Sequence, residues 1–294
     1  MKYFELDSYK LIDSGLGRKL EEISGFRVIR PCPQAIWFPS VAKEEWNKAE
    51  AICHRKKDGG GTWEYKLNDK KKELEKLFFE QKILNKNLKL KLKFTNFGHC
   101  GVFFEHIQVW QTITEKIQDH NAKKLKILNL FAYTGGLSCA LALMGHSVDH
   151  IDSARGVLDW GMENQQLNNL KDGTINWIHE DAHRFVKKME KKGTTYDGII
   201  ADPPSWGHGA KKEKWIYDEQ IAVFSESCVR ILKKDSSFLF LSGHTHGIQS
   251  GCLRNLLLPY KMFGQIDSGD LNIMHQDGKR TLPSGIYSFA HSFK

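Results

Sequence analysis

A carboxylate, two prolines and a tryptophan stand together in residues 198–207, whose sequence is GIIADPPSWG. The apolar run ends on Asp202, Pro203 and Pro204 follow it, and Trp206 comes shortly after. Each proline fixes its own φ and removes a backbone donor, so we expect a stiff, extended turn. A carboxylate held beside an aromatic face suits hydrogen bonding to the amino group of a flat base that stacks on the ring. The alternative is an ordinary turn whose tryptophan covers the edge of a sheet.

A glycine turn lies upstream, in the sequence KILNLFAYTGGL of residues 126–137. Residues 127–131 predict a buried strand, and residues 137–144 predict the start of a buried helix. Between them, Gly135 and Gly136 permit positive φ and the close approach of a ligand. Such a turn presents unpaired N–H groups and the positive end of a helix dipole, which suits a carboxylate or a phosphate. The turn does not match the G-x-G-x-x-G pattern, so alone it is weak evidence.

Two more acids follow strand-like segments. Residues 147–152 end on Asp152, where dinucleotide-binding folds place an acid on a ribose hydroxyl. Residues 175–178 predict the next strand, and Asp181 and Ala182 follow it. Asp181 is suited to accept a hydrogen bond from an exocyclic amine such as that of adenine. Each aspartate alone is more typical of a helix N-cap, but together, on successive strand ends, they favour a nucleoside pocket.

The elements that must position these residues alternate between strand and helix, which predicts an α/β fold with a parallel sheet covered on both faces. Ligands of such sheets bind outside the carboxyl ends of the strands, where the acids and glycines fall. A closing antiparallel pair is expected at one edge. The remaining expected strands are 196–202, 237–241, 262–266 and 286–289, and the remaining helices are 109–119, 155–169, 218–232 and 251–259.

The ordered motifs FAYTGG, HID, HEDA and DPPSWG resemble those of class I S-adenosylmethionine-dependent methyltransferases. More narrowly, they are similar to bacterial methyltransferases of the 23S (large-subunit) ribosomal RNA, whose first loop reads F-x-Y-T-G-G and whose fourth strand ends in D-P-P. Segments 11–15, 30–37, 101–106 and 282–287 also resemble that group. The resemblance covers nearly the whole chain, and the second half carries the more specific motifs.

The resemblance implies a Rossmann-like seven-stranded methyltransferase sheet at residues 98–294. Residues 1–97 would form a small β-rich (α+β) domain that is a candidate for binding the RNA substrate. The implied methyl donor is S-adenosylmethionine, with Glu105 reaching its ammonium group, Asp152 its ribose and Asp181 its adenine. The implied cofactor-binding residues are Glu105, Phe131, Thr134, Gly135, Gly136, Asp152, Asp181, Ala182 and Asp202, and the implied catalytic residues are Asp202, Pro203 and Trp206.

The implied reaction is direct methyl transfer to a base nitrogen, an exocyclic amine or a ring nitrogen of a purine. Relatives that methylate carbon 5 of cytosine carry a nucleophilic cysteine just after the fifth strand. Here residues 241–246 read LSGHTH, without a cysteine. We expect Cys139 and Cys228 to be small buried apolar residues. Carbon-5 chemistry is therefore disfavoured.

The charge of the chain fits a polyanionic partner. The 294 residues carry a formal net charge of +8 and a pI near 9.0, which suits RNA, although a lysine-rich surface also serves solubility. The resemblance implies that this RNA is large-subunit ribosomal RNA. Residues 88–94 alternate leucine and lysine, which predicts a strand with lysines on its outer face. The other basic runs are 54–57, 70–72, 123–124 and 211–212.

Six cysteines without a C-x-x-C pair, no signal peptide and no long apolar run predict a cytoplasmic protein that is a monomer or homodimer and binds no membrane. His208, His244 and His246 lack acids or cysteines at ligand spacing, so no metal is expected. Two alternatives remain open. One is a methyltransferase that acts on a protein or a small molecule, and the other is a non-catalytic RNA-binding module or a nicotinamide enzyme.

Overall fold

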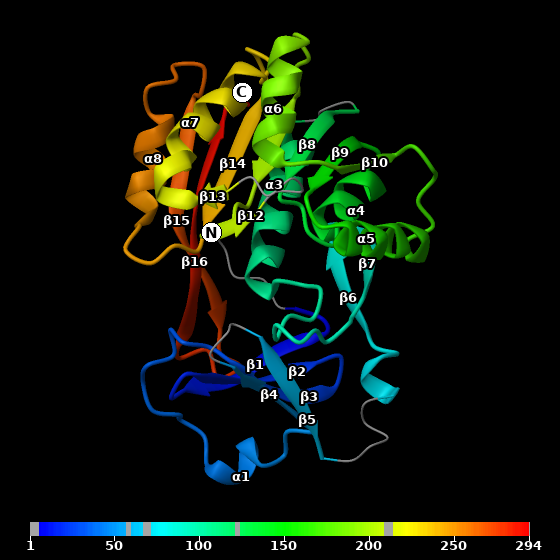
Figure 1. The fold of residues 1–294 in the computed structure, drawn as a ribbon, viewed down its shortest axis with the longest axis vertical. Helices are drawn as coiled ribbons and strands as arrows, with labels where there is room; N and C mark the ends of the chain where they lie inside the picture. Colours follow the sequence, from blue (N-terminus) through cyan, green and yellow to red (C-terminus); the bar gives the residue numbers. More distant parts are fainter. Residues whose placement is uncertain (1–5, 57–59, 67–71, 121–123, 209–213, 294) are drawn as a thin grey trace. The chain divides into compact units, whose positions relative to one another are not determined.

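The computed structural model describes residues 6–56, 60–66, 72–120, 124–208 and 214–293 (Figure 1). Contacts divide the chain into two compact units, the first formed by Met1–Gln111 with Asn272–Ser284, and the second by Thr112–Leu271 with Gly285–Lys294. The expected domain boundary between residues 97 and 98 stays a prediction. The basic residues at 57, 70–71, 123 and 211–212 lie outside the described residues.

The first unit is rich in β-structure, as expected. Its main sheet has the order β1-β2-β3-β4-β5, in which β3 and β4 pair in parallel and the other neighbours are antiparallel. The hairpin β6–β7 contains the alternating leucine–lysine run, and Leu88 and Leu90 are buried as that pattern predicts. The elements are β1 (Tyr9–Gly15), β2 (Arg18–Ile23), β3 (Phe26–Pro31), α1 (Lys43–Trp46), β4 (Ala51–Arg55), β5 (Gly61–Tyr65), β6 (Phe78–Ile83), β7 (Lys86–Lys91) and η1 (Phe104–His106).

A buried carboxylate joins distant parts of the first unit. The Asp13 carboxylate is fully buried and accepts hydrogen bonds from the Trp46 indole at 3.1 Å and from the Arg280 guanidinium at 2.7 Å. Next to it, Ser14 Oγ lies 2.9 Å from His275 Nε2. Buried charges are stable only when they are paired and hydrogen-bonded. Residues near the carboxyl end of the chain therefore complete the core that the amino-terminal strands begin.

The second unit is a seven-stranded sheet with the order β10-β9-β8-β11-β14-β16-β15. The first five strands are parallel, and β16 pairs antiparallel with β14, so the expected antiparallel segment at one edge is confirmed. The strands are β8 (Lys126–Leu130), β9 (Ser147–Asp152), β10 (Ile175–His179), β11 (Gly198–Ala201), β14 (Phe238–Gly243), β15 (Gln265–Met274) and β16 (Thr281–His291). The helices are α3 (Ile107–Asp119), which leads in from the first unit, α4 (Gly136–Leu143), α5 (Arg155–Leu167), α6 (Ala182–Lys191), α7 (Tyr217–Arg230) and α8 (Ser250–Leu257).

Alternation along the strands divides the core between the two faces of this sheet. Leu128, Leu130, Ile199 and Leu239 share one buried cluster with the apolar residues of α6, α7 and α8. Helices α4 and α5 contact β9 and β10. A parallel sheet covered in this way leaves its strand ends as the accessible edge.

Two elements of the second unit are not among those expected from the sequence. One is helix α6, and the other is the short hairpin of β12 (Trp206–His208) and β13 (Lys214–Ile216). Both follow the carboxyl ends of sheet strands, so both bear on the site described below. Among the described helices, none combines the length and the apolarity needed to cross a membrane.

Candidate active site

The sheet register brings the sequence-predicted acids to one edge. Strand β8 lies between β9 and β11, with Leu130 opposite both Ile151 and Ala201, and β10 lies beside β9. Since these strands are parallel, the residues that follow them meet at their common carboxyl edge. Phe131, Asp152, Asp181 and Asp202 stand at these four ends.

The turn after β8 has an unusual backbone. Phe131, Tyr133 and Gly135 have φ values of 54°, 53° and 76°, in the left-handed region. For residues other than glycine this region costs about 1–2 kcal/mol each, so surrounding contacts must hold the turn. Gly135 is the N-cap of α4, and a Cβ on it would lie 2.6 Å from the Trp177 ring. Helix α4, whose first backbone N–H groups are free, therefore begins at a position that only glycine can occupy.

Hydrogen bonds with buried polar side chains hold this turn in place. His150 Nε2 lies 3.1 Å from the Tyr133 carbonyl and therefore donates to it, which leaves Nδ1 to accept from Ser138 Oγ at 2.9 Å. Burial lowers the pKa of His150 to about 3, so the ring is neutral. The Asn164 side chain donates to the carbonyl of Thr134, which is itself buried. These positioning residues could not be predicted from the sequence, because a polar residue in a strand or helix gives no sign of its distant partner.

Asp152 supports the same turn and faces a cleft. Its carboxylate accepts from the backbone N–H of Tyr133 and of Ala154, both at 2.9 Å. Burial raises the pKa of Asp152 above its ordinary value, although these two hydrogen bonds act in the opposite direction. The cleft measures about 40 Å³ and is lined by Phe131, Ile151, Asp152, Ser153, Asp181, Ala182, Pro204, Gly207 and Trp215.

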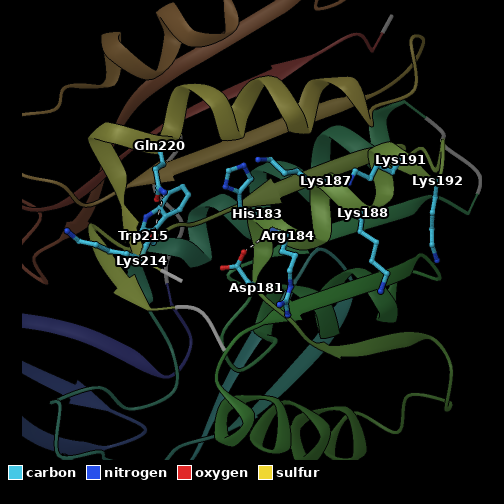
Figure 2. Close-up of a pocket in the computed structure, with 10 residues that line it drawn as sticks. All are labelled: Asp181, His183, Arg184, Lys187, Lys188, Lys191, Lys192, Lys214, Trp215 and Gln220. Carbon is cyan, nitrogen blue, oxygen red and sulfur yellow. Dashed lines mark hydrogen bonds between the residues drawn. The ribbon is translucent and has the colours of Figure 1, made fainter. Parts of the chain in front are cut away.

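Asp181 caps helix α6, as the alternative interpretation of this residue predicted. Its Oδ1 accepts from the Arg184 N–H at 2.8 Å. In the described part of the chain, no hydrogen bond to its Oδ2 is found, so capping leaves one oxygen for a ligand. Asp181 and Trp215 also line a larger groove of about 620 Å³ that adjoins the cleft (Figure 2). Small-molecule pockets are typically about 300–1,000 Å³, so a nucleoside needs space beyond the cleft alone.

The turn after β11 is held at several points. Asp202 Oδ1 accepts from Ser242 Oγ at 2.6 Å and lies 3.2 Å from His244 Nε2. The Trp215 indole donates to the Pro204 carbonyl at 2.7 Å, and the Tyr217 N–H donates to the Ser205 carbonyl at 3.1 Å. The carboxylate is therefore fixed by Ser242 near the end of the neighbouring strand β14 and by His244 just after that strand. Ser242 and His244 lie in the LSGHTH segment, from which the sequence predicted neither a nucleophilic cysteine nor a metal ligand and gave no sign of a contact with Asp202.

Trp206 begins β12 and is 59% exposed, whereas Trp215 on the paired strand is buried. The buried ring anchors the hairpin through its bond to Pro204, and the exposed ring remains accessible. Pro203 is buried beside Asp202. Of the sequence-predicted site residues, Glu105 alone belongs to the first unit, in η1, and its role stays a prediction.

Cys139 and Cys228 are buried, as expected. Burial raises the pKa of the Cys139 thiol to about 12 and raises that of Cys228 as well. The thiolate is the reactive form of cysteine. Neither residue is therefore suited to act as a nucleophile.

Comparison with known proteins agrees with this geometry. The sequence profile of the family described as S-adenosylmethionine-dependent methyltransferase matches residues 73–229. A crystal structure of a SAM-dependent methyltransferase from Agrobacterium tumefaciens has a TM-score of 0.86 and 33% identity, covering 99% of this chain and 92% of that one. The SMU.776 structure complexed with SAH has a TM-score of 0.68 at 17% identity, covers 98% of this chain and 76% of that one, and shows the same fold.

Curated relatives extend the similarity at lower coverage. The ribosomal RNA large subunit methyltransferase K/L of Pseudoalteromonas atlantica is 30% identical over 175 residues, which are 58% of this chain and 24% of that protein. The protein of the same name from Shewanella frigidimarina is 29% identical over 52% of this chain and 21% of its own length. The matched region thus spans about a quarter or less of these relatives. By its family profile, its fold and the residues at its sheet edge, this chain belongs to the S-adenosylmethionine-dependent methyltransferases.

Proposed function

We propose that this enzyme transfers the methyl group of S-adenosylmethionine to a base nitrogen of ribosomal RNA. The proposal rests on one observation: the Asp202 carboxylate and the exposed ring of Trp206 stand on the same fixed turn. A carboxylate accepts hydrogen bonds from an amino group, and an exposed aromatic face stacks on an unpaired base. The names of the curated relatives, which act on large-subunit ribosomal RNA, support the same substrate class.

The edge of the sheet suits the methyl donor. In this proposal Thr134, Gly135 and Gly136 surround its methionine part, because the amino end of α4 presents unpaired N–H groups to a carboxylate. The Asp152 carboxylate accepts from the ribose hydroxyls. The Asp181 oxygen that does not cap α6 accepts a hydrogen bond from the adenine amine. Ala182 and Phe131 line the same cleft.

When bound, S-adenosylmethionine supplies a methyl group that its sulfonium has already activated. The protein then has to orient the acceptor, and orientation can supply about 7–11 kcal/mol of the barrier. Asp202 and the Pro203 carbonyl accept hydrogen bonds from the amino group, so they stabilise the positive charge that the attacking nitrogen gains. The base reaches this position only when it is unpaired or flipped out of a helix, with Trp206 as its stacking partner.

The direct test follows the label from methyl-labelled S-adenosylmethionine in a lysate of cells that lack the gene, after addition of the purified enzyme. We expect the label in ribonuclease-sensitive material. Mass spectrometry of ribosomal RNA nucleosides should then show one methylated base that cells without the gene lack. Label retained on protein after ribonuclease treatment would contradict the RNA substrate and favour the protein-directed alternative.

A second prediction concerns Asp152 and pH. Because burial raises the pKa of this carboxyl group, the wild-type enzyme should lose affinity for S-adenosylhomocysteine (SAH) as the pH falls, at a higher pH than an exposed aspartate would titrate. A protonated carboxyl is a poorer acceptor for ribose hydroxyls. Hydrogen bonds to a charged group contribute about 1.5–3 kcal/mol, so Asp152→Asn should weaken binding about tenfold or more at neutral pH.

Calorimetric titration with SAH across a pH series measures both effects. The variant's affinity should vary little with pH, since its amide does not titrate. Parallel pH profiles for the wild type and the variant would show that Asp152 does not bind the ribose.

A further inference from the structure

Helix α6 presents a row of basic side chains to the larger groove beside the cleft. The groove is lined by Lys187, Lys188, Lys191 and Lys192 on one side and by Lys214 of β13 on the other (Figure 2). All five lysines are exposed. We call these five residues the α6 basic groove. Nothing in the proposed cofactor pocket uses them.

The row follows from the amphipathic pattern of α6. Ala182, Phe185, Val186 and Met189 are buried against the sheet at intervals of three and four residues, which is the spacing of one helix face. The lysines recur on the opposite face. Their positive charges therefore lie within a few residues of one another on a concave surface rather than being scattered over the chain.

The acids near the groove already have other partners. Glu180 pairs with Arg184, and Glu190 pairs with Arg230. Asp181 accepts the N–H at the start of α6. In contrast, no ion pair between a carboxylate and any of the five lysines is found among the described residues. The five lysines are thus not paired with carboxylates in the described part of the chain, and Asp181 is the acid that lines the groove with them.

The charges in the groove affect the pKa of the neighbouring His183. The His183 side chain lines the groove, and its Nε2 is buried without a hydrogen-bond partner in the described part of the chain. Burial lowers the pKa of His183, and the charge of Lys187 lowers it further. The charge of Asp181 raises this pKa, so His183 is subject to both the lysine and the carboxylate of the groove.

The α6 basic groove is continuous with the proposed site. It shares Asp181 and Trp215 with the cleft. On the hairpin, Trp206 pairs with Ile216, which is two residues from Lys214 on the same strand. Because side chains alternate along a strand and paired residues share a face, Trp206 and Lys214 point to the same face. Lys214 and Trp215 both line the groove, so the groove adjoins the hairpin that carries Trp206.

We propose that the α6 basic groove binds the phosphodiester backbone of the RNA next to the base that is methylated. This inference rests on the proposed function, since it assumes an RNA substrate. Lysines that contact phosphates fix the register of a nucleic acid, whereas base contacts carry its sequence information. The groove would hold the strand while Trp206 and Asp202 engage one base.

A triple variant tests the groove. Lys187→Gln, Lys188→Gln and Lys191→Gln together remove three charges, and glutamine preserves the helix propensity of α6. Binding of a fluorescein-labelled single-stranded RNA is measured by fluorescence anisotropy over a series of salt concentrations. Each phosphate contact contributes about 0.7 to the slope of log affinity against log salt, so we expect the slope to shrink by about 2 and the affinity to fall about tenfold or more.

A matched control removes the same charge elsewhere in the second unit. Lys171, Lys234 and Lys261 are exposed and lie outside the groove. Their replacement by glutamine should leave both affinity and slope close to the wild type. SAH affinity should be unchanged in both variants, which shows that each is folded.

Equal losses in the two triple variants, or no loss in the α6 variant, would overturn the groove as the RNA site. If the wild type still binds and methylates RNA in that case, the proposed function stands without the groove. Absence of RNA binding by the wild type would overturn both, and the labelling experiment above would then identify the true acceptor.

Discussion

Replacing Asp202 with alanine should lower the single-turnover rate of methyl transfer to RNA by about 100- to 1,000-fold, the usual cost of removing one group that stabilises charge in a transition state. The Asp202 carboxylate is the acceptor that we assign to the attacking amino group. Its loss leaves Ser242 with another acceptor, because Ser242 Oγ also lies 3.3 Å from the Ala201 carbonyl. The turn should therefore keep its shape, and SAH should still bind.

Rapid-quench measurements with labelled methyl donor and calorimetry with SAH give the two readouts. Asp235→Ala is the matched control, since Asp235 is an exposed aspartate in the loop before β14. It should leave both readouts unchanged. A variant at Asp202 that transfers the methyl group at the wild-type rate would remove this residue from the chemistry.

Gly135→Ala should destabilise the fold and weaken SAH binding by more than tenfold. Its φ of +76° costs any other residue about 1–2 kcal/mol. In addition, the new Cβ would lie 2.6 Å from the Trp177 ring. That ring cannot easily move away, because its Nε1 donates to Gln165 Oε1 at 2.6 Å. The amino end of α4 must therefore shift, and with it the N–H groups assigned to the methyl donor.

Gly145→Ala separates strain from crowding. Gly145 lies just after the other end of α4 and has a φ of +93°, but a Cβ there meets no atom within 4 Å. Urea denaturation should show only the strain cost for Gly145→Ala and a larger loss for Gly135→Ala. Equal stability losses together with unchanged SAH affinity in both variants would show that the space at Gly135 has no part in binding.

The second unit was largely predictable because its strands are short apolar runs that end in polar residues. A parallel sheet brings such ends to one edge, so Asp152, Asp181 and Asp202 were expected near one another before the sheet order was known. Helix α6 was not among the expected elements, although its four apolar residues have the spacing of one helix face. The hairpin β12–β13 was missed because each strand has only three residues.

The supporting contacts of the site could not be predicted from the sequence. His150 reads as one residue of a strand, and only the packing of β9 against α4 places it between Ser138 and Tyr133. The fit of Trp177 over Gly135 likewise joins two segments that are distant in the chain. Periodicity reports which face of an element is buried, but it does not report which side chain stands opposite.

The buried Asp13 has a consequence for how the protein is made. Its cationic partner, Arg280, follows it by 267 residues in the chain. Removing one partner of a buried ion pair typically costs about 3–5 kcal/mol, since the remaining charge is uncompensated. A nascent chain that has emerged only as far as strand β5 therefore holds an immature amino-terminal sheet. That sheet reaches its final stability only after translation has delivered Arg280, which comes after strands β8 to β15 in the chain.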